Sequence, residues 1–173
     1  MFEQNRERNL TMVMDFYELT MANGFFQDGV GQRLAAFDVF YRQNPDGGGF
    51  AIFGGLEQIV EYIENLHFSP EDIDFLRSQG IFSKEFLDYL AAFRFTGSVY
   101  ALREGTVMYP GTPIVTVIAP VIQAQLVETA LLLEINHQSL IATKASRIVR
   151  AAQGRGVSDF GARRAHNMDS AVY

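Results

Sequence analysis

Hydrophobic and polar positions follow two periods along this chain, one typical of helices and one typical of strands. Helix-favouring composition or helical spacing of apolar residues predicts helices at 10–27, at 56–66, from Pro70 onward, at 83–93 and within 121–153. Runs rich in apolar, aromatic or β-branched residues, bounded by Gly and Pro, predict strands at 34–41, 50–53, 97–105, 113–120 and 157–160. A further helix is expected from Ala165. This mixture predicts an α/β fold.

Capping and breaking residues define several of these boundaries. The first helix is expected to stop near Gly24, and Ser69-Pro70 places a cap residue and a first-turn proline in the order that a new helix needs. Residues 121–153 contain neither Gly nor Pro and would extend roughly 50 Å as one helix. Charged and polar residues interrupt this stretch too often for a membrane helix. It therefore predicts one long helix or two consecutive ones, ended by Gly154.

Composition narrows the class of protein. The chain has 173 residues, of which 48% are hydrophobic, so it can bury a substantial core as one domain or slightly more. It has no cysteine, which excludes disulfides and thiolate metal sites. The first residues lack the apolar stretch of a signal peptide, and no apolar run approaches the length of a membrane span. We therefore expect a soluble, cytoplasmic protein without a membrane partner.

Positive charge is concentrated in one segment of an acidic chain. Residues 144–166 hold six basic side chains and one acid, a net charge of +5, whereas the rest of the chain carries eight basic and nineteen acidic groups, a net charge of −11. Arginine matches phosphate and carboxylate groups in pairs of hydrogen bonds, so the cluster favours an anionic ligand. A solubilising helix face is the equal alternative. Overall acidity argues against non-specific nucleic-acid binding.

Other candidate chemistry is weak. The three histidines lie far apart in the sequence and no paired-carboxylate spacing accompanies them, so a metal site built by the protein is not expected. His67 and His137 are interpreted as structural. The glycines at 47–49 and 54–55 are interpreted as turns, since no Gly-Lys-Ser/Thr follows them to form a phosphate loop.

Four segments, taken together and in order, resemble the nicotinate phosphoribosyltransferase family. They are MDFYELTMANGFF, GGFAIFGGLEQIVEYI, FRFTGSVYALREGTVMYPGTPIVTVIAP, and LVETALLLEINHQSLIATKASRIVRAA followed by SDFGARRAH. The resemblance covers nearly the whole chain and implies a type II phosphoribosyltransferase-like fold. It implies an α+β N-terminal domain at 1–120, a connecting helix at 121–156, and at 157–173 the first strand and the start of a helix of a truncated α/β barrel. Because the family's proteins are longer, we expect an N-terminal part of one.

The resemblance also implies a reaction. In this family, nicotinate attacks the anomeric carbon of phosphoribosyl pyrophosphate, which expels pyrophosphate and yields nicotinate mononucleotide for NAD salvage. Positioning and neutralisation of the pyrophosphate by Arg, Lys and Mg²⁺ would carry catalysis. ATP is a co-substrate that acts through a phosphorylated histidine, which would lie beyond Tyr173. The family works as a homodimer with its active sites between subunits.

Site residues transfer from the resemblance by position. Tyr17 matches the tyrosine that covers the nicotinate ring in the neighbouring subunit, and Phe160 matches the aromatic residue on the ring's other face. For Tyr17 the alternative is a core or capping role, and for Phe160 it is a plain barrel-core role. Arg163 and Arg164 match paired arginines at the carboxyl end of the first barrel strand, which contact nicotinate carboxylate or ribosyl phosphates. Since adjacent strand residues point to opposite faces, Arg163 is the catalytic choice, and Arg164 would rather bind an acid in the barrel wall or the partner subunit. Asp159 would orient such an arginine.

Three further residues are candidates for a phosphate contact or a subunit interface. Lys144 and Arg147 match a recurrent family segment and share a helix face, with a surface salt bridge as the equal alternative. His166 follows the arginines. Met14 departs from the usual family start near Tyr17. Rival functions are a nicotinamide or quinolinate phosphoribosyltransferase of the same fold, or a non-catalytic module that binds a phospholigand or nucleic acid through the basic helix.

Overall fold

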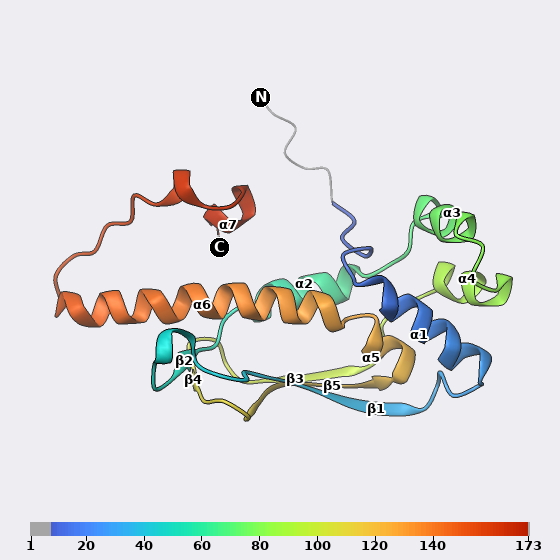
Figure 1. Ribbon diagram of the computed structural model, residues 1–173, viewed down its shortest axis with the longest axis horizontal. Helices are drawn as coiled ribbons and strands as arrows, with labels where there is room; N and C mark the ends of the chain where they lie inside the picture. Colours follow the sequence, from blue (N-terminus) through green and yellow to red (C-terminus); the bar gives the residue numbers. More distant parts are fainter. Residues whose placement is uncertain (1–7, 173) are drawn as a thin grey trace.

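A computed structural model describes residues 8–172 (Figure 1). Its helices are α1 Phe16–Gln27, α2 Leu56–Asn65, α3 Pro70–Ser78, α4 Lys84–Ala91, α5 Val121–Gln125, α6 Glu128–Ala152 and α7 Met168–Val172, with 3-10 turns η1 Pro45–Gly47 and η2 Ala162–Arg164. Its strands are β1 Leu34–Phe40, β2 Ala51–Ile52, β3 Ser98–Ala101, β4 Val107–Met108 and β5 Pro113–Pro120. The mixed α/β class predicted from the sequence is confirmed.

A three-stranded antiparallel sheet, in the order β1-β5-β3, forms one layer of the molecule. Alternation places one set of side chains inward, and Val115, Val117 and Ala119 of β5 are buried on that face. The opposite face leaves Tyr100 and Ile118 exposed. Strand β5 runs directly into α5, so the sheet leads the chain to the start of the long helix α6.

Helix α6 runs past the second sheet, the pair β2-β4, and packs beside α2 (Figure 1). Gly55, at φ +100, lets α2 start close to α6, because a Cβ there would lie 2.9 Å from the carbonyl oxygen of Glu134. The two backbone amides at the start of α2, those of Gly55 and Leu56, donate to one carboxylate oxygen of Glu104 at 2.7 and 2.8 Å. The glycine pair 54–55 is therefore a turn, as expected from the sequence, and Glu104 already occupies the amides of Gly55 and Leu56.

Most predicted helices and strands are present. The glutamates at 57, 61 and 64 are exposed on α2, and Ser69 with Asp72 forms a capping box at the start of α3. The stretch 121–153 is two helices, the second of the two alternatives, and Gln153 and Gly154 end α6 with positive φ. The core joins both sheets to the helices through large side chains such as Phe53, Phe86, Ile122 and Leu131.

One boundary at the start of the chain was predicted wrongly. Helix α1 begins at Phe16, after Asp15, and not at residue 10. It ends at Gln27, the end of the predicted range 10–27, and passes Gly24, where the sequence had indicated a stop, because Phe25 and Phe26 beyond it pack on the core. The short strand β4 was not predicted as a separate element, since two residues carry too little pattern to be recognised.

Candidate functional site

The segment after α6 carries most of the residues predicted to bind ligand, and its structure differs from the prediction. Residues 157–160 form no strand, because no strand among residues 8–172 lies beside them to supply hydrogen-bond partners. Instead, the Gly161 amide donates to the Asp159 carboxylate at 2.6 Å, which turns the chain. Arg163 and Arg164 consequently lie in the 3-10 turn η2 and not at the end of a strand.

The side chains of this segment point to solvent. Phe160 is 79% exposed, and Asp159, Arg163, Arg164 and His166 are also exposed. Within the described part of the chain, no hydrogen bond or ion pair holds the side chains of Arg163 and Arg164. Their predicted contacts with a ligand therefore stay predictions, and both guanidinium groups are accessible.

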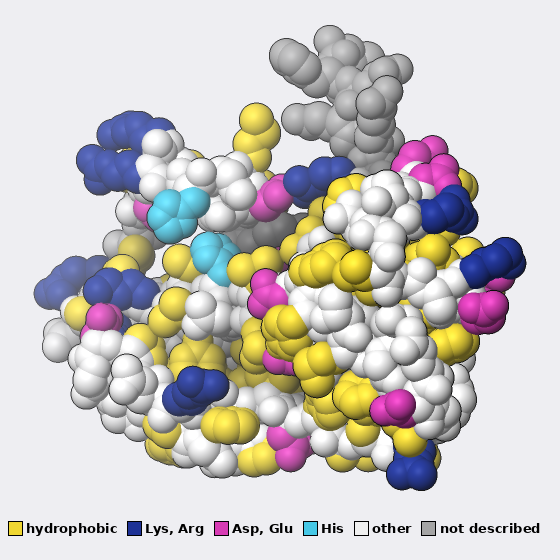
Figure 2. All heavy atoms as spheres, turned by 45° about the vertical axis from the view of Figure 1, so that its right-hand side comes forward, with side chains coloured by type: hydrophobic (Ala, Val, Ile, Leu, Met, Phe, Trp, Pro, Cys, Tyr) yellow, Lys and Arg dark blue, Asp and Glu magenta, His cyan; other side chains and the backbone are white. Residues whose placement is uncertain are grey.

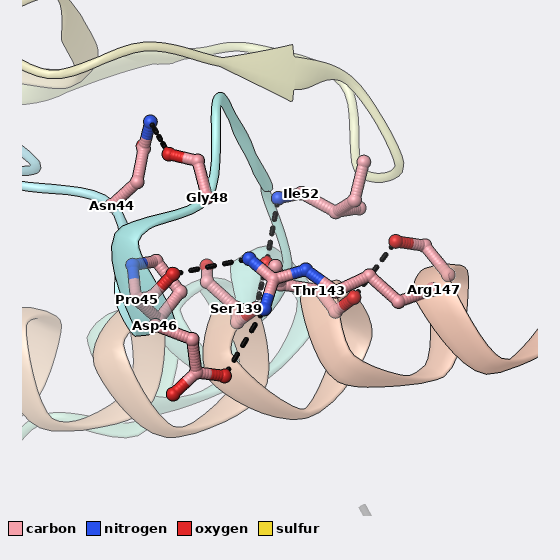
Figure 3. A network of polar contacts seen from close by, with 9 residues as sticks. Asn44, Pro45, Asp46, Gly48, Ile52, Ser139, Thr143 and Arg147 are labelled. Atoms are coloured by element: carbon pink, nitrogen blue, oxygen red, sulfur yellow. Dashed lines mark hydrogen bonds and ion pairs between the residues drawn. The ribbon is translucent and has the colours of Figure 1, made fainter.

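The two basic candidates on α6 have different surroundings. Lys144 is exposed. Arg147 reaches across to the loop after β1, where it donates to the Asp46 carboxylate at 3.0 Å and to the Pro45 carbonyl at 3.1 Å (Figure 3). Gly48 lies against this guanidinium group, and a Cβ there would approach Arg147 to 2.2 Å. The salt bridge that sequence reasoning left as an alternative is present for Arg147.

The same loop borders a hollow of about 570 Å³. It is lined by Tyr41, Arg42, Gln43, Asn44, Pro45, Asp46, Gly47, Gly48, Pro110, Asn136 and Leu140. Asn44 donates to the Gly48 carbonyl at 2.9 Å, while its own amide oxygen is buried without a partner among the described residues. Arg42 is exposed at this hollow, and Asp46, whose carboxylate is paired with Arg147, also lines it. Sequence reasoning missed Arg42, because it lies outside the basic cluster and has no distinguishing spacing.

Tyr17 lies in the first turn of α1 with 43% of its surface exposed. Its hydroxyl donates to Oε1 of Glu128 at 2.8 Å, and the other carboxylate oxygen of Glu128 accepts from the Gln125 side-chain amide at 2.8 Å. The hydrogen bond to this carboxylate, followed by partial burial, raises the pKa of Tyr17 to about 12. The phenol therefore stays protonated and remains a hydrogen-bond donor at neutral pH.

A buried carboxylate next to Tyr17 joins the first turns of α1 and α6. Glu18 is 0% exposed and accepts from the backbone amide of Thr129 at 3.0 Å and from its hydroxyl. The Asp15 amide in turn donates to the Thr129 hydroxyl at 3.2 Å. Burial raises the pKa of Glu18, and the bonds from Thr129 oppose this effect. Sequence reasoning missed Glu18 and Glu128, because they meet only when distant parts of the chain pack together.

A larger cavity of about 850 Å³ lies between the first described residues, α2, α6 and the C-terminal segment. All three histidines of the chain, His67, His137 and His166, line it, and Figure 2 shows histidine side chains close together on this face. A bidentate ion pair between Arg8 and Asp169, at 2.9 Å for each contact, closes one side. Among residues 8–172, no group of three or more His or acidic side chains could hold a metal ion.

The eight candidate residues are thus distributed over three places. Tyr17 of α1 contacts the start of α6, Lys144 and Arg147 lie along α6, and the remaining five follow its end. No hydrogen bond or ion pair joins any two of them. None of the helices in the described range is both long and apolar enough to cross a membrane.

Comparison with solved structures identifies the class of fold. The chain superposes on human nicotinic acid phosphoribosyltransferase with a TM-score of 0.76 and 34% identity, over 83% of this chain and 29% of that one. It also superposes on the nicotinate-nucleotide pyrophosphorylase of Pyrococcus furiosus with a TM-score of 0.70 at 21% identity, over 99% of this chain and 38% of that one. The fold is therefore of the type II phosphoribosyltransferase class.

Sequence comparison resolves the family within this class. The profile of the nicotinate phosphoribosyltransferase N-terminal domain matches residues 12–136. Relatives include nicotinate phosphoribosyltransferases of Mycobacterium tuberculosis, 48% identical over 91% of this chain, and of Bacillus subtilis, 40% identical over 97%. The chain belongs to the nicotinate phosphoribosyltransferase family, and it spans about a third of the length of these two relatives (34%).

Proposed function

We propose that this chain contributes to a nicotinate phosphoribosyltransferase, which forms nicotinate mononucleotide and pyrophosphate from nicotinate and phosphoribosyl pyrophosphate in NAD salvage. The observation that carries the proposal is the match to relatives of that name over nearly the whole chain. The exposed aromatic and arginine side chains of the described residues suit the chemistry, because the reaction needs surfaces that hold a flat ring and neutralise phosphates.

Two aromatic side chains are proposed to hold the ring. Tyr17 and Phe160 both expose their rings, and offset stacking on an aromatic ligand contributes about 0.5–1.5 kcal/mol for each pair beyond burial. In this proposal Tyr17 covers the nicotinate bound by a second copy of the chain, so the working protein is a homodimer with sites between subunits. Support comes from the hydroxyl of Tyr17, which is held within its own chain while the ring faces outward.

Anion recognition is proposed for the basic side chains after α6. Arg163 would stabilise charge that develops as pyrophosphate leaves, and Arg164 would contact nicotinate carboxylate or phosphate with Asp159 as an orienting partner. Lys144 and His166 are proposed for a phosphate contact or the subunit interface. Arg147 is already paired with Asp46, so its proposed part is to hold the loop beside the hollow that Arg42 lines.

The proposal includes Mg²⁺, bound to the phosphate substrates, and ATP as a co-substrate. The described residues present no cluster of acids for the metal, so Mg²⁺ would arrive bound to the phosphates of phosphoribosyl pyrophosphate or ATP. When bound there it would neutralise phosphate charge. ATP coupling through a phosphorylated histidine is likewise proposed from the family alone.

The test is an assay of the protein isolated at its natural length, with nicotinate, phosphoribosyl pyrophosphate, ATP and Mg²⁺. Release of pyrophosphate together with nicotinate mononucleotide supports the proposal. Faster turnover of nicotinamide or quinolinate would reassign the substrate. If no pyridine releases pyrophosphate, the proposed activity is wrong.

The role of Arg163 is tested with a matched arginine. Arg163→Ala should lower kcat/KM by about 10²–10³, the typical loss when one group that stabilises developing charge is removed. Arg155→Ala removes an equally exposed arginine of the same segment and should leave kcat/KM unchanged. Near-normal turnover of Arg163→Ala would remove the assignment.

A further inference from the structure

We propose that Glu128 is a positioning residue, which holds the hydroxyl of Tyr17 and thereby fixes the plane of the Tyr17 ring for contact with a flat heteroaromatic ligand. The identity of this ligand as nicotinate rests on the proposed function. The hold itself rests on the geometry of the two helix starts. Glu128 touches no ligand in this proposal and acts through Tyr17.

The contacts of Glu128 leave its carboxylate little freedom. Each oxygen has one partner at 2.8 Å, the Tyr17 hydroxyl for Oε1 and the Gln125 amide for Oε2. Gln125 is itself only 3% exposed, so the carboxylate is tied to a side chain that the core immobilises. A charged acceptor also makes a stronger hydrogen bond than a neutral one. The Tyr17 hydroxyl is therefore held from the core, although its ring lies at the surface.

The helix backbones on both sides of this contact are fixed as well. Glu128 is the first residue of α6, where a negative charge is favoured by the exposed amides of a helix start. The next amide along, that of Thr129, is taken by buried Glu18, and the Thr129 hydroxyl accepts from the amide of Asp15. Glu18 follows Tyr17 on α1, and Asp15 is the residue that precedes this helix. The donor and the acceptor of the Tyr17–Glu128 bond are thus carried by two helix starts that are bonded to each other.

The consequence for binding follows from side-chain order. A tyrosine at the surface without a hydroxyl partner samples several rotamers, and ordering one such side chain on binding costs about 0.5–1.5 kcal/mol. Because Glu128 orders the Tyr17 side chain before the ligand binds, binding no longer carries this cost. Loss of Glu128 should therefore raise the KM for nicotinate by roughly two- to tenfold. The KM for phosphoribosyl pyrophosphate and kcat should change little, because neither depends on the orientation of Tyr17.

A double-mutant cycle in the natural-length protein tests the inference. Glu128→Ala and Tyr17→Phe should each raise the nicotinate KM, and the double variant should show no further rise beyond the larger single effect. Glu128→Gln, whose amide oxygen can still accept from the hydroxyl, should restore most of the affinity. Glu134→Ala, which removes a partly buried acid of the same helix, should leave this KM unchanged. If the effects of Glu128→Ala and Tyr17→Phe on the nicotinate KM multiply in the double variant, the positioning role is wrong.

A spectroscopic titration keeps the inference independent of activity. In the natural-length protein, the difference in ultraviolet absorbance between wild type and Tyr17→Phe should identify the ionisation of Tyr17. This ionisation should shift to lower pH in Glu128→Ala. If this ionisation is unchanged, Glu128 does not hold the hydroxyl and the inference fails. If it shifts but the wild-type protein turns over no nicotinate, the proposed function and the nicotinate assignment fail, while the hold on Tyr17 stands. Far-ultraviolet circular dichroism confirms folding of each variant.

Discussion

Replacing Thr143 with valine should lower the free energy of unfolding by about 1–3 kcal/mol, because it leaves one buried amide without a partner. Strand β2 pairs with β4 along one edge, and side chains of α6 satisfy its other edge. The Ile52 amide donates to the Thr143 hydroxyl at 2.8 Å, and the Gly54 amide donates to the Ser139 hydroxyl at 3.1 Å (Figure 3 includes the first contact). Both hydroxyl side chains are fully buried.

The expected loss in the free energy of unfolding comes from the amide of Ile52. Valine nearly matches the shape of threonine, so no large cavity forms. The Thr143 hydroxyl also donates to the Ser139 carbonyl at 2.6 Å, but this carbonyl is an interior acceptor of α6 and keeps its helical bond. What remains is one desolvated N–H group, whose loss of its partner costs about 1–3 kcal/mol. With a typical urea slope of about 2 kcal/mol per molar, the unfolding midpoint should fall by roughly 0.5–1.5 M.

Thr116→Val is the matched control, since it makes the same chemical change on the outer face of β5. There the threonine hydroxyl donates to the exposed Asp38 carboxylate at 2.5 Å, which water can solvate after the change. This variant should cost less than about 0.5 kcal/mol. Urea unfolding followed by circular dichroism compares the two variants. If Thr143→Val is no more destabilising than Thr116→Val, α6 does not serve as the edge partner of β2.

Three further perturbations test other contacts. Burial raises the pKa of Glu18 in the folded state, so the contribution of Glu18 to the free energy of unfolding is full below its unfolded pKa and is lost as pH rises through its folded pKa. Urea unfolding across pH should therefore show that Glu18→Gln weakens the fall in stability with rising pH. Arg147→Ala should cost about 0.2–1 kcal/mol, and a double-mutant cycle with Asp46→Ala should show that the two losses are not additive. Gly55→Ala should cost at least about 1–3 kcal/mol by thermal unfolding, because its φ of +100 and the nearby Glu134 carbonyl both oppose a Cβ.

Local sequence signals predicted those parts of the fold that local physics determines. The apolar spacing of 56–66 requires one buried face, and Ser69 with Pro70 satisfies a helix start without help from distant residues, so α2 and the start of α3 are found where expected. The prediction of a strand at 157–160 was wrong, because a strand depends on distant residues and not on local signals alone. A strand needs a neighbour, and residues 157–160 find none within the described range.

Contacts between distant segments account for what sequence reasoning missed at the candidate site. Glu128 carries no sequence signal of its own, since an acid at a helix start has a sufficient local role. Only packing of α1 against the start of α6 brings it to the Tyr17 hydroxyl. The resemblance to a family identified Tyr17 by position, whereas the structure adds the acceptor that orients it.

The structure also bears on whether the basic segment is a solubilising face or a place for an anion. Of its six basic side chains, only Arg147 forms an ion pair within residues 8–172, and this pair holds the loop after β1. The other five, Lys144, Arg150, Arg155, Arg163 and Arg164, are exposed and have no acidic partner in that range. Acids elsewhere on an acidic chain could have neutralised them, but the fold keeps them apart. Arg163 and Arg164 follow the exposed ring of Phe160 in this segment, and guanidinium groups without an acidic partner can each pair with a phosphate or a carboxylate, so these two are where the anion-binding alternative would operate.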